Sequence, residues 1–240
     1  MEIMEGMDII DLAIKIDKSL IISDTHIGYE EALNKQGILM PRFHSKELMG
    51  RVKRILERSG ELDRIIINGD VKHEFGIISE TEWRHTLRFL DLLSGYCKEI
   101  ILIKGNHDKI LGPIAKKRDI GIVDFFMIDD NLIVHGDRNL DRLKIDEDKL
   151  KKVKAIVIGH EHPAISLREE SRIETFKCFL RGGYKRYDLI VQPSLNLVAE
   201  GTDILREKTL SPFLKQDLGD FEVYVVADKV YKFGKIKNIT

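Results

Sequence analysis

Five short hydrophobic runs mark this chain, and each of them stops at a cluster of polar residues that can bind metals. The runs are rich in isoleucine and valine, which is typical of buried strands, and they are too short for helices. They span residues 20–22, 64–67, 100–103, 132–134 and 155–158. The clusters after them read Ser-Asp-Thr-His at 23–26, Asn-Gly-Asp at 68–70, Gly-Asn-His-Asp at 105–108, His-Gly at 135–136 and Gly-His-Glu-His at 159–162. Because open α/β sheets bind ligands beyond the carboxyl ends of their strands, we predict that the five loops converge on one site.

The composition favours one catalytic domain over residues 1–240. A chain of 240 residues with 43% hydrophobic residues can fill a large core. The net charge is -1, from 39 basic and 40 acidic residues, so the overall charge does not indicate a nucleic-acid or membrane partner. A local basic patch is compatible with this balance.

Cysteine usage and the N-terminus favour a cytoplasmic protein. Cys97 and Cys178 are far apart and lack the spacing of a metal site, so we interpret them as buried free thiols in a reducing compartment. The N-terminus carries Glu2, Glu5 and Asp8 and no long apolar stretch, so we expect neither a signal peptide nor a membrane span. Charged residues make up 33% of the chain, a composition found in proteins from hot environments.

The first half of the chain has a βαβ pattern. Residues 11–17 and 19–23 predict a hairpin, and helical periodicity follows at 46–58 and 80–93. These helices alternate with the strands, which favours a mostly parallel sheet.

The second half predicts mostly strands. They fall at 125–128, 132–134, around 165, at 173–179, 189–191, 222–226 and 230–233. We therefore predict an α/β protein, a four-layer αββα sandwich of two mixed β-sheets flanked by helices, in which residues 164–240 complete the second sheet. The connection 196–220 is too long for a turn; it either folds over the site as a small cap or wraps the edge of the sandwich.

The polar clusters supply seven oxygen and nitrogen donors and no sulfur. Asp24 and His26 are two residues apart, so an extended backbone would point both side chains the same way, and the same holds for His160 and His162. The full set is Asp24, His26, Asp70, Asn106, His135, His160 and His162. Such donors suit Mn, Fe, Zn, Co or Ni. Seven donors exceed the needs of one ion, whereas two divalent ions about 3.5–4 Å apart that share a carboxylate use them all.

The ordered set of motifs resembles the calcineurin-like metallophosphoesterase superfamily, over residues from about 19 to 163. Three further elements are most similar to archaeal phosphoesterases related to the Mre11 and SbcD nucleases, and to the DNA-ligase-associated phosphoesterases of bacteria. They are Asn-Gly-Asp-Val-Lys-His at 68–73, Pro41-Arg42 and Pro193-Ser194. This resemblance implies the metallophosphoesterase fold and two bound divalent ions, with manganese the first choice.

The resemblance also assigns roles to residues. It implies that Asp24, His26, Asp70 and His162 hold one metal, that Asp70, Asn106, His135 and His160 hold the other, and that Asp70 bridges them. A metal-bridging hydroxide would then attack the phosphate in line. His107 would protonate the leaving oxygen or donate to the phosphate, with Asp108 orienting its ring.

Other candidates are less specific. His73 follows Asp70 by three residues and either supports a metal ligand or is an ordinary loop residue. Arg181, Lys185 and Arg186 surround Gly182-Gly183 in what we interpret as a basic, flexible loop. That loop would contact the phosphates of a substrate, or else it is a solvated turn.

We therefore predict a dinuclear metal-dependent phosphoesterase that cleaves phosphodiester bonds of DNA, RNA or a nucleotide. The alternatives are a phosphomonoesterase for a small molecule and a binding scaffold without activity. Since every expected ligand is present, the scaffold is disfavoured. A protein serine/threonine phosphatase is a poor match, because that group continues Gly-Asp with x-x-Asp-Arg-Gly. A homodimer and a DNA-repair partner are suggested by the resemblance alone.

Overall fold

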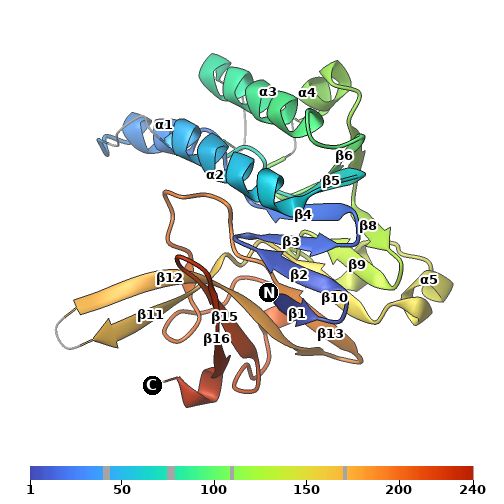
Figure 1. Ribbon diagram of the computed structural model, residues 1–240, viewed down its shortest axis with the longest axis vertical. Helices are drawn as coiled ribbons and strands as arrows, with labels where there is room; N and C mark the ends of the chain where they lie inside the picture. The colour runs from blue at the N-terminus through green and yellow to red at the C-terminus, as the bar shows by residue number, and fades with distance from the viewer. Residues whose placement is uncertain (40–43, 75–78, 109–110, 170–171, 240) are drawn as a thin grey trace.

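Two mixed β-sheets stacked face to face form the centre of this α/β protein (Figure 1). The computed structural model describes residues 1–39, 44–74, 79–108, 111–169 and 172–239. The Pro41-Arg42 segment used in the sequence comparison lies outside the described residues. None of the helices described is long and apolar enough to cross a membrane.

In the part of the chain that the structure describes, the first sheet has seven strands, which follow one another in chain order. They are β1 (Glu2–Met4), β2 (Met7–Ile10), β3 (Ala13–Ile16), β4 (Ser19–Ser23), β5 (Arg64–Asn68), β6 (Glu99–Ile103) and β7 (Gly121–Val123). The first four are joined as antiparallel hairpins, and β4 to β7 run parallel. The predicted turn before Ser19 is confirmed. The N-terminal hairpin β1–β2 was not predicted, although Gly6 supplies the positive φ of its turn.

Four helices cover the outer face of the first sheet (Figure 1). They are α1 (Tyr29–Lys35), α2 (His44–Ser59), α3 (Glu80–Ser94) and α4 (Gly112–Lys117). On α2, Leu48, Val52, Ile55 and Leu56 recur at helical spacing and are buried against the sheet. α3 begins at Ser79, whose hydroxyl accepts a hydrogen bond from the backbone N–H of Glu82. The two helices predicted from periodicity are therefore confirmed.

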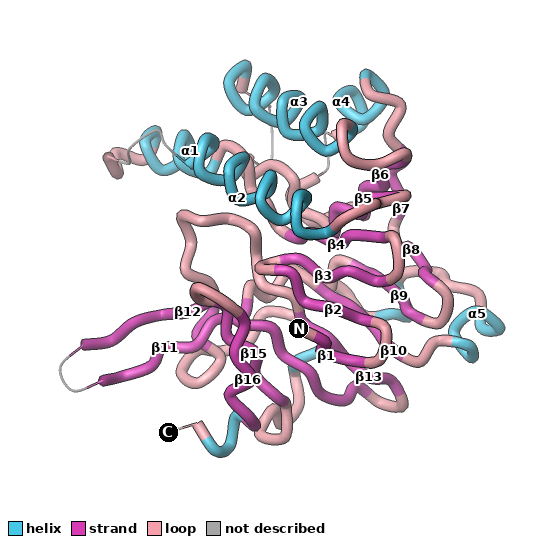
Figure 2. Tube along the Cα trace, viewed as in Figure 1, coloured by secondary structure: helices cyan, strands magenta, loops and turns pink. Residues whose placement is uncertain are grey.

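Within the described residues, the second sheet contains nine strands. They are β8 (Phe125–Ile128), β9 (Asn131–Val134), β10 (Ala155–Ile158), β11 (Pro163–Glu169), β12 (Arg172–Tyr184), β13 (Tyr187–Val191), β14 (Thr202–Asp203), β15 (Glu222–Val226) and β16 (Val230–Lys235). Its order is β14-β11-β12-β13-β10-β9-β8, with β15 paired to β12 and β16. β9, β10 and β13 are parallel. β11 and β12 extend from the sheet as a long two-stranded arm (Figure 2).

Alternating side chains of the second sheet join two cores. Ile133 and Val157 belong to the core that also holds the first sheet, whereas Leu132 and Ile156 belong to a core on the other face. Short segments cover that other face: η1 (Leu140–Arg142), α5 (Glu147–Lys152), η2 (Pro212–Leu214) and η3 (Ile236–Asn238). The predicted class and the two mixed sheets are confirmed; in the described residues, the outer layer of the second sheet consists of single helical turns and loops.

Strand register brings the polar clusters to a common edge. Ser23 pairs with Asn68 at the ends of β4 and β5, and Val134 pairs with Ile158 at the ends of β9 and β10. Because these strands are parallel within each sheet, the loops that follow them leave from the same side.

Candidate metal centre

The strand-end loops meet at one centre that contains three groups of potential metal ligands. These groups are Asp24-His26-His162, Asp70-His135-His160 and His26-His73-His107. The first two groups are subsets of the two ligand sets that the family resemblance implied. The third includes His73 and His107, which were not expected to bind metal.

The candidate ligand atoms of the first group lie within 4.8 Å of one another. Nε2 of His26 lies 3.3 Å from Nε2 of His162, which in turn lies 3.5 Å from Oδ1 of Asp24. Oδ1 of Asp24 is buried and has no hydrogen-bond partner. An unpaired buried carboxylate oxygen costs free energy unless a cation compensates it, so this donor set fits a metal ion.

The second group is organised around His135. Its Nε2 lies 3.1 Å from Oδ1 of Asn106 and 3.4 Å from Oδ2 of Asp70. Its Nδ1 lies 3.3 Å from the carbonyl oxygen of Asn68. When Nδ1–H donates to that carbonyl, the lone pair of Nε2 points at the centre, as a metal ligand requires.

Asp70 lies between the two groups. Its Oδ2 is 3.8 Å from Nε2 of His26, on the side of the first group, and 3.4 Å from Nε2 of His135, on the side of the second. Its other oxygen, Oδ1, accepts a hydrogen bond of 2.9 Å from the backbone N–H of His107. One carboxylate is thus placed where a bridge between two ions needs it.

The ligand loops turn sharply at the strand ends. Five of the seven predicted ligands have left-handed φ angles from +43° to +65°: Asp24, His26, Asp70, His160 and His162. Left-handed backbone is uncommon for residues other than glycine and concentrates at functional sites. The prediction that an extended backbone aligns these pairs is therefore wrong. His160 and His162 belong to different ligand groups because the chain turns between them.

Two glycines allow the loops to approach closely. A Cβ atom at Gly105 would overlap Oδ1 and the backbone nitrogen of Asp70, and one at Gly159 would overlap the side chains of Ser23 and Asp24. Any larger residue would displace a ligand.

Asp108 joins two of the loops. Its oxygens accept backbone hydrogen bonds from Val71 (3.1 Å) and Gly105 (3.0 Å). Burial, together with the charge of Asp70, raises the pKa of Asp108 to about 7. We expected Asp108 to orient the His107 ring. Its hydrogen bonds instead hold the backbones of the two loops.

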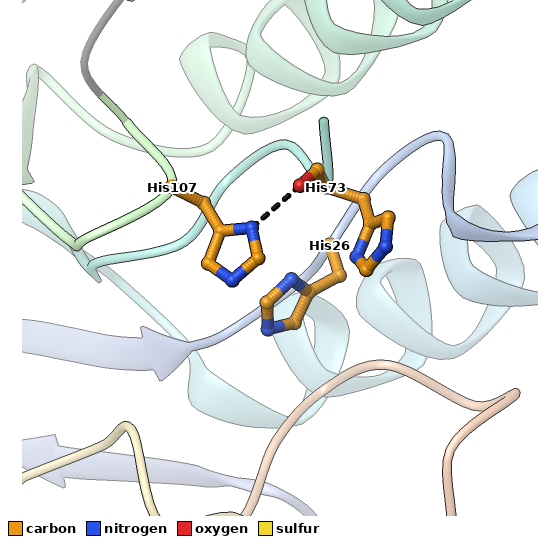
Figure 3. Close-up of side chains that lie close together, drawn as sticks. All are labelled: His26, His73 and His107. Atoms are coloured by element: carbon orange, nitrogen blue, oxygen red, sulfur yellow. Dashed lines mark hydrogen bonds between the residues drawn. The ribbon is translucent and has the colours of Figure 1, made fainter. Parts of the chain in front are cut away.

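His107 is oriented by a backbone group. Its Nδ1 lies 2.5 Å from the carbonyl oxygen of His73, and the rings of His26, His73 and His107 cluster together (Figure 3). Nε2 of His107 is directed toward Oδ2 of Asp70, at 3.9 Å. His107 is half-buried, so a bound substrate can reach it. His73 therefore contributes its carbonyl oxygen as well as its ring.

Glu82 supports this loop, and the sequence did not point to it. The carboxylate lies on the first turn of α3 and is buried, with 1% of its surface exposed. Its Oε1 accepts hydrogen bonds of 3.1 Å from the backbone N–H groups of His73 and Glu74. Lys72 is fully buried beside it and donates to the carbonyl oxygen of Glu74. In the sequence, an acidic residue in a first helical turn indicates only a favourable helix start.

Burial and neighbouring charges set the protonation of the centre. Burial and the neighbouring His162 lower the pKa of His26 to about 3, and burial and His107 lower that of His73 to about 4. For His135, burial is outweighed by hydrogen bonding to Asp70, which raises its pKa to about 10. Metal ions bind the neutral form of imidazole, and the lowered pKa of His26 keeps its ring in that form at neutral pH.

The three basic residues near Gly182-Gly183 do not reach the centre. Arg181 is on β12, where it donates to the carbonyl oxygen of Ile3 at 2.9 Å. Lys185 and Arg186 form the turn between β12 and β13, and Arg186 donates to the carbonyl oxygen of Leu150 at 2.7 Å. Because Asp188 pairs with Ala155, this turn lies at the start of β10, the end opposite to the ligand loop. The predicted flexible loop is a strand and a tight turn.

The two parts of the connection 196–220 make different contacts. Its second part wraps the second sheet, since β14 pairs with β11 and Phe213 and Leu214 are buried in the outer core. Its backbone N–H groups at Leu210 and Ser211 donate to Glu161, between two of the ligand histidines. In its first part, the backbone N–H of Asn196 donates to the carbonyl oxygen of the candidate ligand Asp24 at 3.1 Å.

These features define a metal-dependent phosphoesterase fold with a candidate dinuclear centre. The chain belongs to the calcineurin-like phosphoesterase family, whose model matches residues 18–163. No curated protein matches the chain.

Among solved structures, the chain is similar to nuclease MPE from Pseudomonas putida, with 19% sequence identity and a TM-score of 0.62 over 94% of this chain and 93% of that one. It also matches vacuolar protein sorting 29 from Cryptosporidium parvum, with 13% identity and a TM-score of 0.37 over 90% of this chain and 97% of that one. At these identities the first likeness shows a shared fold. The predicted closer relation to archaeal Mre11-like or ligase-associated enzymes stays a prediction.

Proposed function

We propose that this protein is a dinuclear metal-dependent phosphodiesterase that acts on nucleic acid or a nucleotide. The observation that carries the proposal is the position of Asp70, whose Oδ2 lies between the ring nitrogens of His26 and His135 and thus between two ligand groups. The nuclease with the same fold supports a diester substrate. We also propose that residues 1–240 form one domain, because side chains of both sheets share a core.

The residues present fit two divalent ions. One ion would be held by Asp24, His26 and His162. The other would be held by Asn106, His135 and His160, and Asp70 would bind both ions. When bound, such a pair supplies Lewis acidity toward the phosphate and lowers the pKa of water. Donors of this type suit manganese first, and iron, zinc, nickel or cobalt as well.

His107 is the proposed general acid. Its Nδ1–H is engaged by the carbonyl oxygen of His73, so Nε2 is the ring atom that faces the centre. A proton on Nε2 can pass to the leaving oxygen of the ester, or remain there and donate to the phosphate. Asp108 and Glu82 hold the backbones on either side, so the ring keeps its direction during the reaction.

Metal analysis and substrate screening test this proposal together. Purified protein reloaded with Mn²⁺ should bind two ions per chain and cleave an aryl phosphodiester faster than the matching monoester. A faster monoester reaction would indicate a phosphatase, and failure to bind manganese, iron, zinc, nickel or cobalt would indicate the binding scaffold.

Asp70→Asn supplies the residue-specific test. It removes charge from both groups at once, so turnover should fall more than in His73→Ala, even at saturating Mn²⁺. Wild-type turnover in Asp70→Asn would refute the bridging role. His85→Ala, on α3 and outside the ligand groups, is the matched histidine control.

A further inference from the structure

Glu161 is a buried carboxylate between two candidate metal ligands. It lies in the loop after β10, between His160 and His162, and 0% of its surface is exposed. The ligand groups formed by the described residues do not include it. A buried carboxylate costs free energy unless hydrogen bonds or cations compensate it, so its presence at this position needs a physical reason. The hydrogen bonds that it accepts supply that reason.

Glu161 holds a segment that is distant in the sequence. Its Oε2 accepts hydrogen bonds from the backbone N–H groups of Leu210, at 2.8 Å, and Ser211, at 2.7 Å. The hydroxyl group of Ser211 donates to the carbonyl oxygen of Gly136 at 2.8 Å. Because Gly136 lies in the ligand loop after β9, this segment is bonded to two ligand loops at once. We call residues 209–214 the strap.

The strap is anchored to the second sheet independently of the ligand loops. The hydroxyl group of Ser211 accepts from the N–H of Phe213 at 3.3 Å, and that of Thr209 donates to the carbonyl oxygen of Leu214 at 3.3 Å. Phe213 and Leu214 are buried in the outer core, where the ring centroids of Phe213 and Tyr184 lie 4.7 Å apart. A segment fixed in this way can restrain the loops that are bonded to it.

The two loops that the strap holds carry ligands of the same ion. His135 directly precedes Gly136, and His160 directly precedes Glu161; both histidines belong to the second ligand group. The loops are also joined to each other, since the backbone N–H of Gly159 donates to the carbonyl oxygen of His135 at 2.9 Å. A shift of either loop would therefore change the separation of the two histidines.

Ligands of the first group have supports of their own. The hydroxyl group of Ser194 and the backbone N–H of Asn196 donate to the carbonyl oxygen of Asp24, at 2.8 Å and 3.1 Å. The N–H of Thr202 donates to the carbonyl oxygen of His162 at 2.9 Å. Because these bonds do not involve the strap, loss of its contacts should affect the two ions unequally.

We propose that the strap positions the ligands of the second group, with Glu161 and Ser211 as the positioning residues. It holds the loops after β9 and β10 against one anchored segment and thereby keeps His135 and His160 at the separation that their shared ion requires. The effect depends on the hydrogen bonds, so an amide in place of the carboxylate preserves it. This inference rests on the proposed function for the two ions, but it concerns metal binding and needs no turnover.

Titration of the metal-free protein with Mn²⁺ measures the effect. Glu161→Ala removes the acceptor of two backbone N–H groups, so binding of the ion of the second group should weaken by about 10–100-fold, the usual effect of losing an outer partner of a metal ligand. The affinity for the other ion should change much less. In the electron paramagnetic resonance spectrum, the signal of a coupled Mn²⁺ pair should give way to that of an isolated ion.

Two further variants separate hydrogen bonding from charge. Glu161→Gln keeps an oxygen that can accept both N–H groups, so it should restore most of the lost affinity and the coupled signal. Ser211→Ala removes only the hydroxyl group that holds the loop after β9. It should weaken the same ion, and it carries the test if Glu161→Ala does not fold.

Val223→Ala controls for a general loss of stability. Val223 is buried in the same outer core, and its strand partners Leu180 and Gly234 lie outside the ligand loops. The substitution should lower the melting temperature through the cavity that it leaves, and both ions should keep their affinity.

Three results would overturn the role of the strap. They are wild-type affinity for both ions in Glu161→Ala and Ser211→Ala, a selective loss of one ion in Val223→Ala as well, and a loss in Glu161→Gln as large as in Glu161→Ala. None of them bears on the proposed activity. Conversely, if the wild type binds two ions and cleaves no ester, while Glu161→Ala selectively loses one ion, the phosphodiesterase is refuted and the role of the strap is supported.

Discussion

Nδ1 of His107 lies 2.5 Å from the carbonyl oxygen of His73, so the loop after β5 orients a side chain of the loop after β6. The same loop after β5 carries Asp70, which accepts the backbone N–H of His107. The backbone and the ring of His107 are thus both held by the loop that follows β5. Asp70, the proposed bridge between the two metal ions, therefore also holds the backbone of the proposed acid.

The first prediction concerns His107 itself. His107→Ala should leave two metals bound but lower turnover by about 10²–10⁴, the range for a lost general acid. If protonation of the leaving group is its main role, the loss should shrink on p-nitrophenyl esters, because p-nitrophenolate leaves without a proton. If stabilisation of phosphate charge dominates, the loss should be the same on both kinds of ester. Unchanged turnover on both would remove His107 from the mechanism.

Glu82 should act through the loop that it holds. Glu82→Ala removes the acceptor for two backbone N–H groups, which should lower the free energy of unfolding by roughly 3 kcal/mol. The shifted His73 carbonyl should also misplace His107 and reduce kcat by about 10–100-fold with little change in KM.

The conservative change provides the control. Glu82→Gln keeps an amide oxygen that can accept both bonds, so it should restore most of kcat. Glu80→Gln alters an exposed carboxylate of the same helical turn and should have no effect. If Glu82→Ala retains wild-type kcat, the loop does not need this support.

Gly105→Ala should damage the metal centre specifically. The added methyl group would overlap the Asp70 carboxylate, so metal content should fall below two ions per chain. Unfolding free energy should also fall, by about 1–3 kcal/mol, as expected for overpacking. Gly112→Ala, where nothing lies within 4 Å of the added atom, should change neither. Metal analysis combined with chemical denaturation checks both quantities.

The stability of the protein should depend on pH through Lys177. Burial and the positive charge of Arg51 lower the pKa of Lys177 to about 8, against weaker opposing effects of Asp24, Cys178 and Glu200. In the folded protein the amino group is therefore mostly charged at pH 7 and mostly neutral at pH 9.

The free energy of unfolding should respond to this lowered pKa at alkaline pH. An unfolded lysine titrates near 10.4, above the folded value of about 8, so between these two pH values the unfolded chain binds more protons. The contribution of Lys177 to the unfolding free energy therefore rises with pH in this window. Denaturation of the wild type and of Lys177→Met at pH 7 and pH 10 measures the difference.

The strands and the clustering of the candidate ligands were predictable because their signals are local. An isoleucine-rich run such as 64–67 is buried in any sheet that it enters, and a polar cluster directly after it must lie at the strand end. The N-terminal hairpin was not predicted because β1 and β2 have only three and four residues, too few for a clear alternation of apolar and polar residues. The fourth layer was harder, since single turns such as η1 have no periodicity to detect.

By itself, the sequence determined which chemical groups meet, through the order of strand-end motifs that bring Asp24, Asp70 and His135 to a common edge. Tertiary structure decided how they meet. The left-handed turns at the ligands, the support of Glu82 beneath the His73 loop, and the placement of Lys185 at the far end of the sheet all depend on contacts between segments distant in sequence. Local residue preferences carry no information about such contacts, because their free energy arises only when the whole chain has packed.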